Sequence, residues 1–269
     1  MDKRPIGVFD SGLGGLTTVK KLAELLPGEN IIYLGDTGRV PYGPRSKETI
    51  IKYTSQGAAF LAGFDIKAMV IACNTACSAA FEILESTYDI PVYEVVNIPA
   101  KAAVKHTDNK RVGVIGTAAT IRSGAYETTL KKLSPDLTVL SVPCPLFVPL
   151  VEEGWIDPVD EAALVIAERY LEVLREAKID TLILGCTHYP LLREVISKVI
   201  GPGVKLIDSG AETAKQVASD MAQLGLLAEN DTNGSIKYFV TDSIGSFSKH
   251  ASRFLESDVY GMVEQITLE

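Results

Sequence analysis

Short apolar runs rich in valine and isoleucine alternate along the chain with longer segments of helical periodicity. The runs predict strands at Ile6–Phe9, Ile31–Leu34, Ala68–Ala72, Val92–Val95, Val112–Ile115, Val139–Val142, Thr181–Leu184, Val204–Ile207 and Ile236–Val240. Amphipathic helical segments between them include Leu16–Leu26, Lys47–Ala62, Glu161–Glu176 and Ala211–Leu224. Strands that are apolar on both faces and alternate with helices are typical of parallel sheets covered by helices on both sides. The pattern therefore predicts an α/β fold.

A faint internal repeat divides this pattern into two halves. Ile6–Thr17 (IGVFDSGLGGLT) and Val112–Ser123 (VGVIGTAATIRS) both place a glycine within an apolar strand and follow the strand with a small polar turn. In each half a later apolar strand ends in a cysteine, at Cys73 and at Cys186. Coincidence is the alternative, because strands followed by glycine turns are common in α/β proteins. The paired cysteines favour a duplicated α/β unit.

Composition and charge exclude several classes of protein. The chain has 269 residues, of which 46% are hydrophobic and 22% charged, as in a globular protein. Its net charge of −8 argues against nucleic-acid binding, which needs a basic face, but leaves small anionic substrates open. No apolar run reaches the ~18 residues of a membrane span, and the N-terminus lacks the apolar core of a signal peptide. Because no membrane span is predicted, we expect no membrane partner. The four cysteines do not form a disulfide framework, so we expect a cytoplasmic protein.

Polar clusters follow four of the predicted strands, at the edge where open parallel sheets bind ligands. They are Asp10-Ser11-Gly12, Cys73-Asn74-Thr75, Thr117–Thr120 and Cys186-Thr187-His188. Each cluster also lies where we expect a helix to begin, so helix capping is the plain alternative for most of these residues. The free N–H groups of a helix start can also hold a carboxylate or phosphate. Capping does not explain a cysteine at both equivalent positions.

The two equivalent cysteines have two interpretations of about equal weight. Free cysteine is most often a small buried hydrophobe. At the start of a helix, however, the helix dipole lowers a thiol pKa from its usual value of about 8.5, so Cys73 and Cys186 can exchange protons near neutral pH. Cys77 and Cys144 are expected to be packing residues. The spacing from Cys73 to Cys77 lacks a second Cys or His pair that would complete a metal site.

Three further ionisable residues and one loop are candidates for the site. Asp10 is either a helix cap or surface carboxylate, or a group that holds a neighbouring base. Glu152 lies in LVEEGWID, which is otherwise a solvated helix end, and His188 can share a proton with the thiol of Cys186 if it is not structural. The loop Gly35–Ser46 is too long for a plain turn and is expected to form a wall of the site. Nucleotide binding is weakly supported, because the glycine-rich turn matches neither a dinucleotide fingerprint nor a phosphate-binding loop.

With these motifs the sequence closely resembles the glutamate racemases of the aspartate/glutamate racemase superfamily, over essentially the whole chain. The resemblance rests on IGVFDSGLGGLT, YLGDTGRVPYGPRS, VIACNTA, VGVIGTAAT and LILGCTHYPLL, which occur in order. It implies a racemase without cofactor or metal in which Cys73 and Cys186 are the catalytic bases, assisted by Asp10, Glu152 and His188. It further implies that glutamate is held by Asp10, Ser11, Pro41, Tyr42, Gly43, Asn74, Thr75, Thr117, Thr120, Thr187 and His188.

The chemistry of racemisation agrees with a duplicated fold. A proton must leave one face of the stereocentre and return to the other, and one base on each face does this most directly. No lysine pattern for pyridoxal binding is apparent, so an electron-sink cofactor is not implied. We therefore expect two similar parallel-sheet α/β domains, related by pseudo-twofold symmetry, with the site in the cleft between them. The resemblance suggests that residues 1–96 and 207–269 form the first domain and residues 97–206 the second.

Other functions stay open from the sequence. The leading hypothesis is an enzyme that makes D-glutamate, which bacteria use in peptidoglycan. Three related functions would use cysteine as an acid/base in the same way and differ in pocket size: an aspartate racemase, a hydantoin racemase or an arylmalonate decarboxylase relative. A carboxylate-binding protein that has lost catalysis is a further alternative. A homodimer is expected only because homodimers are the commonest assembly.

Overall fold

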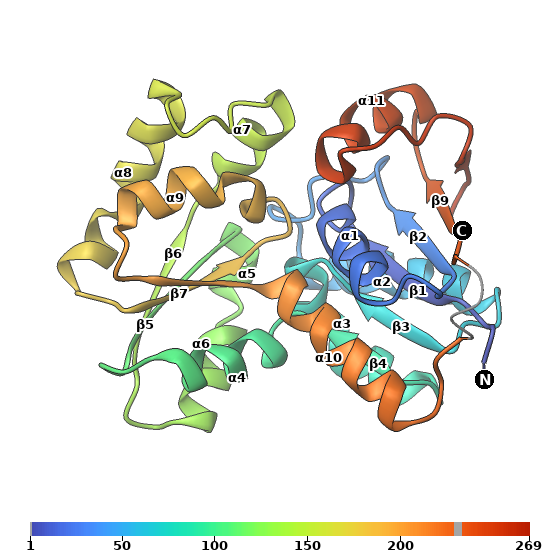
Figure 1. The fold of residues 1–269 in the computed structure, drawn as a ribbon, viewed down its shortest axis with the longest axis horizontal. Coiled ribbons are helices and arrows are strands. Elements are labelled where there is room, and N and C mark those ends of the chain that lie inside the picture. Colours follow the sequence, from blue (N-terminus) through green and yellow to red (C-terminus); the bar gives the residue numbers. More distant parts are fainter. Residues whose placement is uncertain (1, 229–232) are drawn as a thin grey trace.

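The computed structural model describes residues 2–228 and 233–269, which form two lobes, each built on one parallel sheet (Figure 1). The first sheet runs, in spatial order, β10 (Val263–Gln265), β9 (Ile236–Val240), β2 (Ile31–Gly35), β1 (Ile6–Asp10), β3 (Ala68–Ile71) and β4 (Val92–Glu94). The second runs β6 (Thr138–Pro143), β5 (Arg111–Gly116), β7 (Thr181–Gly185) and β8 (Lys205–Asp208). Every predicted strand is present, and the predicted fold class is confirmed.

One strand was not expected. β10 is three residues long and reads Val-Glu-Gln, so it carries only one apolar side chain. It pairs with β9 at the edge of the first sheet, where two of its three residues are exposed. A short, polar edge strand of this kind gives no periodic signal. The helix predicted to start at Ala211 begins instead at Ser209, because the carboxylate of Asp208 accepts a hydrogen bond from the Ala211 N–H at 3.0 Å.

The two sheets repeat the same topology. The order β2-β1-β3-β4 corresponds strand for strand to β6-β5-β7-β8, and all of these pairs are parallel. The glycine in the central strand is needed at the same contact in both lobes. A Cβ atom on Gly7 would lie 2.8 Å from Cδ1 of Ile66, and a Cβ atom on Gly113 would lie 2.6 Å from Cδ1 of Ile179. The sequence repeat is thus a structural duplication.

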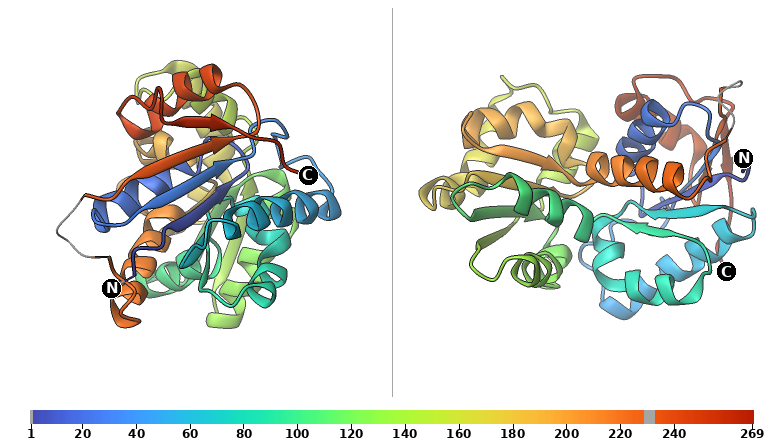
Figure 2. Two further views of the ribbon diagram at one scale, coloured as in Figure 1. Left: turned by 90° about the vertical axis from the view of Figure 1, so that its right-hand side faces the viewer. Right: turned by 60° about the horizontal axis from the view of Figure 1, so that its bottom comes forward.

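Helices cover both faces of each sheet (Figures 1 and 2). Over the first sheet, one face packs against α1 (Leu16–Leu25), α10 (Ser209–Gln223) and α11 (Ile244–Leu255), and the other against α2 (Lys47–Ala62) and α3 (Asn74–Thr87). Over the second sheet, one face packs against α7 (Phe147–Glu153), α8 (Glu161–Glu176), the 3-10 turn η1 (Tyr189–Leu192) and α9 (Arg193–Ile200), and the other against α4 (Asn97–His106) and α6 (Ala125–Leu133). The short helix α5 (Ala118–Arg122) follows β5.

The chain passes between the lobes after β4 and again after β8 (Figure 1). The segment with β9, α11 and β10 then lies with the first lobe, because β9 pairs with β2. β8 pairs with β7 as far as Asp208, two residues past the predicted boundary at 206/207. The domain boundaries themselves stay a prediction; residue 1 and residues 229–232, which fall within the predicted first domain, lie outside the described residues. Among the described residues, no helix is both long and apolar enough to cross a membrane.

Candidate active site

A cavity between the lobes is lined by residues from both of them. Its lining comprises Ser11, Gly12, Leu13, Val40, Pro41, Tyr42, Gly43, Cys73, Asn74, Thr75, Thr117, Val148, Glu152, Cys186, Thr187 and His188. The sequence candidates Asp10 and Thr120 do not line it, and both are buried behind it. Sequence reasoning missed Leu13 and Val148, which carry no reactive group, whereas Gly12 belongs to the first polar cluster and Val40 to the loop that was expected to form a wall. Both equivalent cysteines are present, so the cavity has a thiol from each lobe.

Cys73 follows β3 and caps the start of α3. Its Sγ atom accepts the N–H of Ala76 at 3.5 Å, and its thiol donates to the hydroxyl of Ser11 at 3.2 Å. Burial, together with the nearby negative charge of Asp10, raises the pKa of the Cys73 thiol to about 12. The prediction that the helix start lowers this pKa is therefore wrong, because burial and a neighbouring carboxylate outweigh the helix dipole. Cys73 rests as a neutral thiol.

Asp10 lies beneath the cavity with none of its surface exposed. One carboxylate oxygen accepts the N–H of Gly12 at 2.9 Å, and the other, Oδ1, has no hydrogen-bond partner among the described residues. Burial raises the pKa of Asp10, and the opposing charge of His188 partly offsets this. The alternative of a surface carboxylate is wrong because Asp10 is fully buried, and the alternative of a helix cap is wrong because α1 begins only at Leu16. Asp10 thus affects the cavity through its charge on Cys73.

Cys186 has a different environment from Cys73. Its Sγ atom lies 4.0 Å from Nδ1 of His188, and Nε2 of His188 lies 3.3 Å from Oε1 of Glu152. Burial would lower the pKa of His188, but its contacts with Cys186 and Glu152 outweigh burial and raise the pKa to about 10. The ion-pair contact with His188 in turn lowers the pKa of Glu152, whose side chain is 43% exposed. Cys186, His188 and Glu152 thus form a chain of contacts from the buried thiol to the protein surface.

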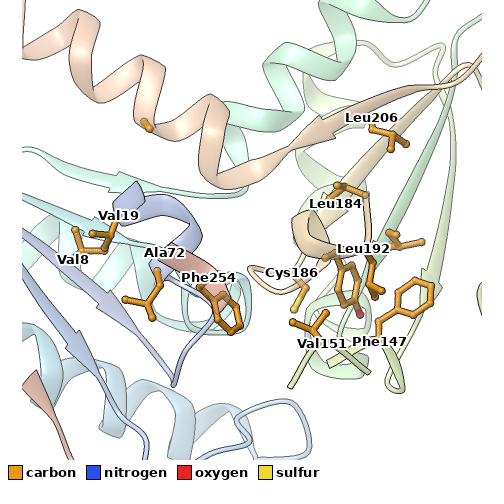
Figure 3. Close-up of a cluster of buried hydrophobic side chains, with 14 of the residues drawn as sticks. Val8, Val19, Ala72, Phe147, Val151, Leu184, Cys186, Leu192, Leu206 and Phe254 are labelled. Carbon is orange, nitrogen blue, oxygen red and sulfur yellow. The ribbon is translucent and has the colours of Figure 1, made fainter. Parts of the chain in front are cut away.

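The expected helix start at Cys186 is also wrong. The residues that follow form the 3-10 turn η1, which begins at Tyr189 without a side-chain cap. Figure 3 shows Cys186 at the border of an apolar cluster, between second-lobe side chains such as Phe147 and the ring of Phe254 on α11. The thiol therefore lies at the boundary between the lobes, where a ligand in the cavity can reach it.

Three threonine hydroxyls join the lobes at one side of the cavity. Thr75 on α3 lies 2.9 Å from Thr117 and 3.3 Å from Thr120, measured between hydroxyl oxygens, and Thr117 and Thr120 lie 3.0 Å apart. Thr117 also caps α5 by accepting the N–H of Thr120 at 3.2 Å. Thr120 is buried, so it contacts the other two hydroxyls and supports them from behind.

Asn74 lines the cavity, but its side-chain amide is already engaged. The hydroxyl of Tyr126 donates to Oδ1 of Asn74 at 2.6 Å, and Nδ2 of Asn74 donates to the hydroxyl of Ser209 at 3.3 Å. Asn74 belongs to the first lobe, Tyr126 to the second, and Ser209 to the start of α10, beside a crossing of the chain. The amide therefore also fixes the lobes at their junction.

The loop from Gly35 to Ser46 contributes Val40, Pro41, Tyr42 and Gly43 to the cavity wall. Asp36 organises this loop and was missed in the sequence. It accepts hydrogen bonds from Tyr42 at 2.5 Å, from Arg39 at 2.7 Å and from Thr241 at 2.8 Å. Its partners lie up to 205 positions away, and the signal that could have found it is its place directly after β2.

The glycine-rich turn of the first lobe packs tightly on the second lobe. A Cβ atom on Gly14 would lie 2.0 Å from the hydroxyl of Thr187, so only glycine fits there. The hydroxyl of Thr17 also donates to the carbonyl of Thr187 at 3.1 Å. Within residues 2–228 and 233–269, no group of three His, Cys, Asp or Glu side chains is arranged to hold a metal ion.

Two thiols from opposite lobes, with hydroxyl and N–H donors between them, define a class of site. Such a site can remove a proton from one face of a small molecule and return one to the other face. The model of the Asp/Glu/Hydantoin racemase family matches residues 6–217. The chain belongs to this family, and it is an amino-acid racemase.

The known relatives it resembles are similar over their full lengths. The chain is 49% identical over 269 residues to glutamate racemase of Geobacter metallireducens, covering 100% of this chain and 98% of the relative. Glutamate racemase of Bacillus anthracis superposes with a TM-score of 0.94 at 40% identity, covering 100% of this chain and 99% of that one. Glutamate racemase of Francisella tularensis, solved in complex with D-glutamate, has a TM-score of 0.92 at 40% identity with the same coverage.

Proposed function

We propose that this protein interconverts L- and D-glutamate without a cofactor, with Cys73 and Cys186 as the two acid/base groups. The observation that carries the proposal is geometric. The two thiols follow equivalent strands of duplicated lobes and line one cavity. Full-length similarity to glutamate racemases, one of them solved with D-glutamate, supports glutamate as the substrate.

The proposed reaction moves one proton off the substrate and one onto it. The thiolate of one cysteine removes the Cα proton, and the resulting carbanion takes a proton from the thiol of the other cysteine on the opposite face. The product is the other enantiomer, and the two sulfurs have exchanged protonation states. The enzyme then returns to its starting state by exchanging protons with solvent. Because the enantiomers are equal in energy, the enzyme only lowers the barrier.

The two thiols have unequal assistance in this scheme. Cys73 rests as a neutral acid because burial and Asp10 disfavour its ionised form. Negative charge on Cys186 is stabilised by the imidazolium of His188, whose own charge is stabilised by Glu152. In the reverse direction Cys73 must become the base. Its thiol must then lose a proton although the negative charge of Asp10 disfavours the thiolate. We therefore propose Asp10, Glu152 and His188 as assisting residues.

The carboxylates of glutamate are proposed to bind uncharged donors. The cavity lining includes the hydroxyls of Ser11, Thr75, Thr117 and Thr187 and no lysine or arginine among the described residues. The N–H groups at the start of α3 provide a further anion-binding element. Pro41, Tyr42, Gly43 and Asn74 shape the wall, while Asp10 and Thr120 support it from behind. Fixed donors in a site shielded from water also stabilise the developing carbanion.

The cellular role is a further part of the proposal. D-glutamate made by this enzyme would supply peptidoglycan synthesis, and the protein would act in the cytoplasm as a homodimer. The four free, buried cysteines agree with a reducing compartment. Sedimentation of the purified protein at several concentrations tests the dimer.

The activity is tested by incubating the purified protein with L-glutamate in D2O without added cofactor. Loss of the Cα proton signal by NMR, with D-glutamate appearing in a chiral assay, is the expected result. Exchange of the Cα proton of L-aspartate but not of L-glutamate would show that the enzyme is specific for aspartate. Exchange with neither would overturn the proposal and favour a catalytically silent carboxylate-binding protein.

A further inference from the structure

We infer that Arg253 of α11 is a positioning residue that holds Glu152 against His188 from the opposite lobe. The inference rests on the proposed function, because the Glu152–His188 pair is taken to assist Cys186. α11 belongs to the first lobe, whereas Glu152 lies at the end of α7 in the second. Figure 1 shows the two helices facing each other at the top of the molecule.

The guanidinium of Arg253 caps the end of α7. Its Nη1 atom donates to the carbonyl of Val151 at 3.1 Å and to the carbonyl of Glu152 at 2.5 Å. α7 has only seven residues, and the last carbonyls of a helix have no partner within the helix. A cation at a helix C-terminus also interacts favourably with the helix dipole. Arg253 therefore fixes the backbone that carries the Glu152 side chain.

Gly154 packs against the same guanidinium. It ends α7 with a φ of +86°, and a Cβ atom there would lie 2.7 Å from Nη2 of Arg253. The guanidinium thus occupies the space beside the glycine. Gly201 ends α9 with a φ of +98°, but a Cβ atom there would meet nothing within 4 Å. Gly201 is therefore a second helix-ending glycine with a positive φ and without the arginine contact; its ψ of 157° differs from the 19° of Gly154.

The same helix also contacts the histidine of the pair. The ring of Phe254 packs edge-on against His188, with ring centroids 5.6 Å apart at 88°. The charged groups that act on the Glu152 carboxylate are His188 from the second lobe and His250 from α11, whereas Arg253 contacts the backbone carbonyl of Glu152. Glu153 and Asp242 line the adjacent cavity with Glu152. One helix of the first lobe therefore holds both members of the Glu152–His188 pair.

The first test measures the titration of His188 in the Glu152–His188 pair and does not depend on enzymatic turnover. The chain has three histidines, so NMR titration resolves His188, with His188→Asn as the assignment variant. Arg253→Gln is expected to lower the pKa of His188, in the direction produced by Glu152→Gln. Lys249→Gln, an exposed charge on the same helix, is the control and should leave the titration unchanged. An unchanged His188 pKa in Arg253→Gln would overturn the inference even if racemisation were absent.

The second test separates positioning from loss of fold. Arg253→Gln is expected to lower kcat about tenfold with a smaller change in KM, because the barrier and not substrate binding is affected. Arg253→Lys should restore part of the loss. Gly154→Ala should lower kcat in the wild-type protein but add little to Arg253→Gln, whereas Gly201→Ala should leave kcat unchanged. Additive effects of Gly154→Ala and Arg253→Gln, or equal losses in Gly201→Ala, would contradict the inference.

Discussion

Cys73 and Cys186 occupy equivalent positions at the ends of β3 and β7, yet their surroundings differ in charge. Cys73 has the carboxylate of Asp10 behind it, whereas Cys186 has the imidazole of His188 at 4.0 Å. Duplication placed a thiol on each side of one cavity, and the two thiols then acquired different charged neighbours. The chemistry of the two half-reactions should therefore differ.

Replacing either thiol should abolish racemisation. Without Cys73 or Cys186, one face of the substrate has no group to take or give the proton, so Cys73→Ala and Cys186→Ala are expected to show no interconversion by the chiral assay. Each Cys→Ser variant should still eliminate a leaving group from a β-substituted analogue of one enantiomer, because elimination needs a single base. Full racemisation in both directions by either alanine variant would contradict the assignment of two bases.

The pH dependence of stability should reveal His188. Its pKa is raised to about 10 in the folded protein from an ordinary value of 6.5, so the unfolded chain releases this proton first as pH rises. The stabilisation is thus fully present below pH 6.5 and is lost as pH rises towards 10. Urea unfolding should show the free energy of unfolding falling more steeply with pH in the wild-type protein than in His188→Asn. Parallel slopes for the two proteins would contradict this.

Asp10→Asn should make Cys73 easier to ionise. Removing the carboxylate takes away the charge that adds to the effect of burial, so the pKa of Cys73 should fall. Alkylation at Cys73, followed against pH by mass spectrometry of the Cys73 peptide in a Cys186→Ser background, reports this thiol and not Cys77 or Cys144. The midpoint should move to lower pH in the Asp10→Asn variant. An unchanged or higher midpoint would show that Asp10 does not act on Cys73 through its charge.

The duplicated glycines should be sensitive to a single methyl group. A Cβ atom on Gly7 or Gly113 would overlap Cδ1 of Ile66 or Ile179, at 2.8 Å and 2.6 Å. Gly7→Ala and Gly113→Ala are each expected to cost about 1–3 kcal/mol of folding stability, as overpacked cores do. Urea denaturation measures this, and Ile66→Val or Ile179→Val should recover part of the loss in the matching variant. A neutral Gly113→Ala would argue against the close contact.

The fold was predictable because the inner strands of both sheets are apolar on two faces. The edge strand β10 was not predicted because its three residues carry only one apolar side chain. At the site, the residue types and their order after the strands indicated which side chains gather in the cavity. They did not indicate the sign of the pKa change at Cys73, because burial depth and the position of Asp10 depend on how the chain packs.

The residues that sequence reasoning missed act through contacts between distant segments. Asp36 joins its own loop to Thr241, and Arg253 reaches across to the end of α7. Neither belongs to a motif with fixed spacing, and an isolated aspartate or arginine on an expected loop or helix is ordinarily a solvated charge. Only the three-dimensional arrangement shows that they shape the site.

The most direct measurement of the two-base mechanism follows deuterium in each enantiomer early in the reaction. L-glutamate is incubated with the protein in D2O, the enantiomers are separated, and the Cα hydrogen isotope of each is determined by mass spectrometry. Two separate thiols predict that the newly formed D-glutamate carries deuterium while the remaining L-glutamate keeps its original proton. Transfer of the original proton into D-glutamate would show that one group serves both faces, and it would contradict the assignment of Cys73 and Cys186.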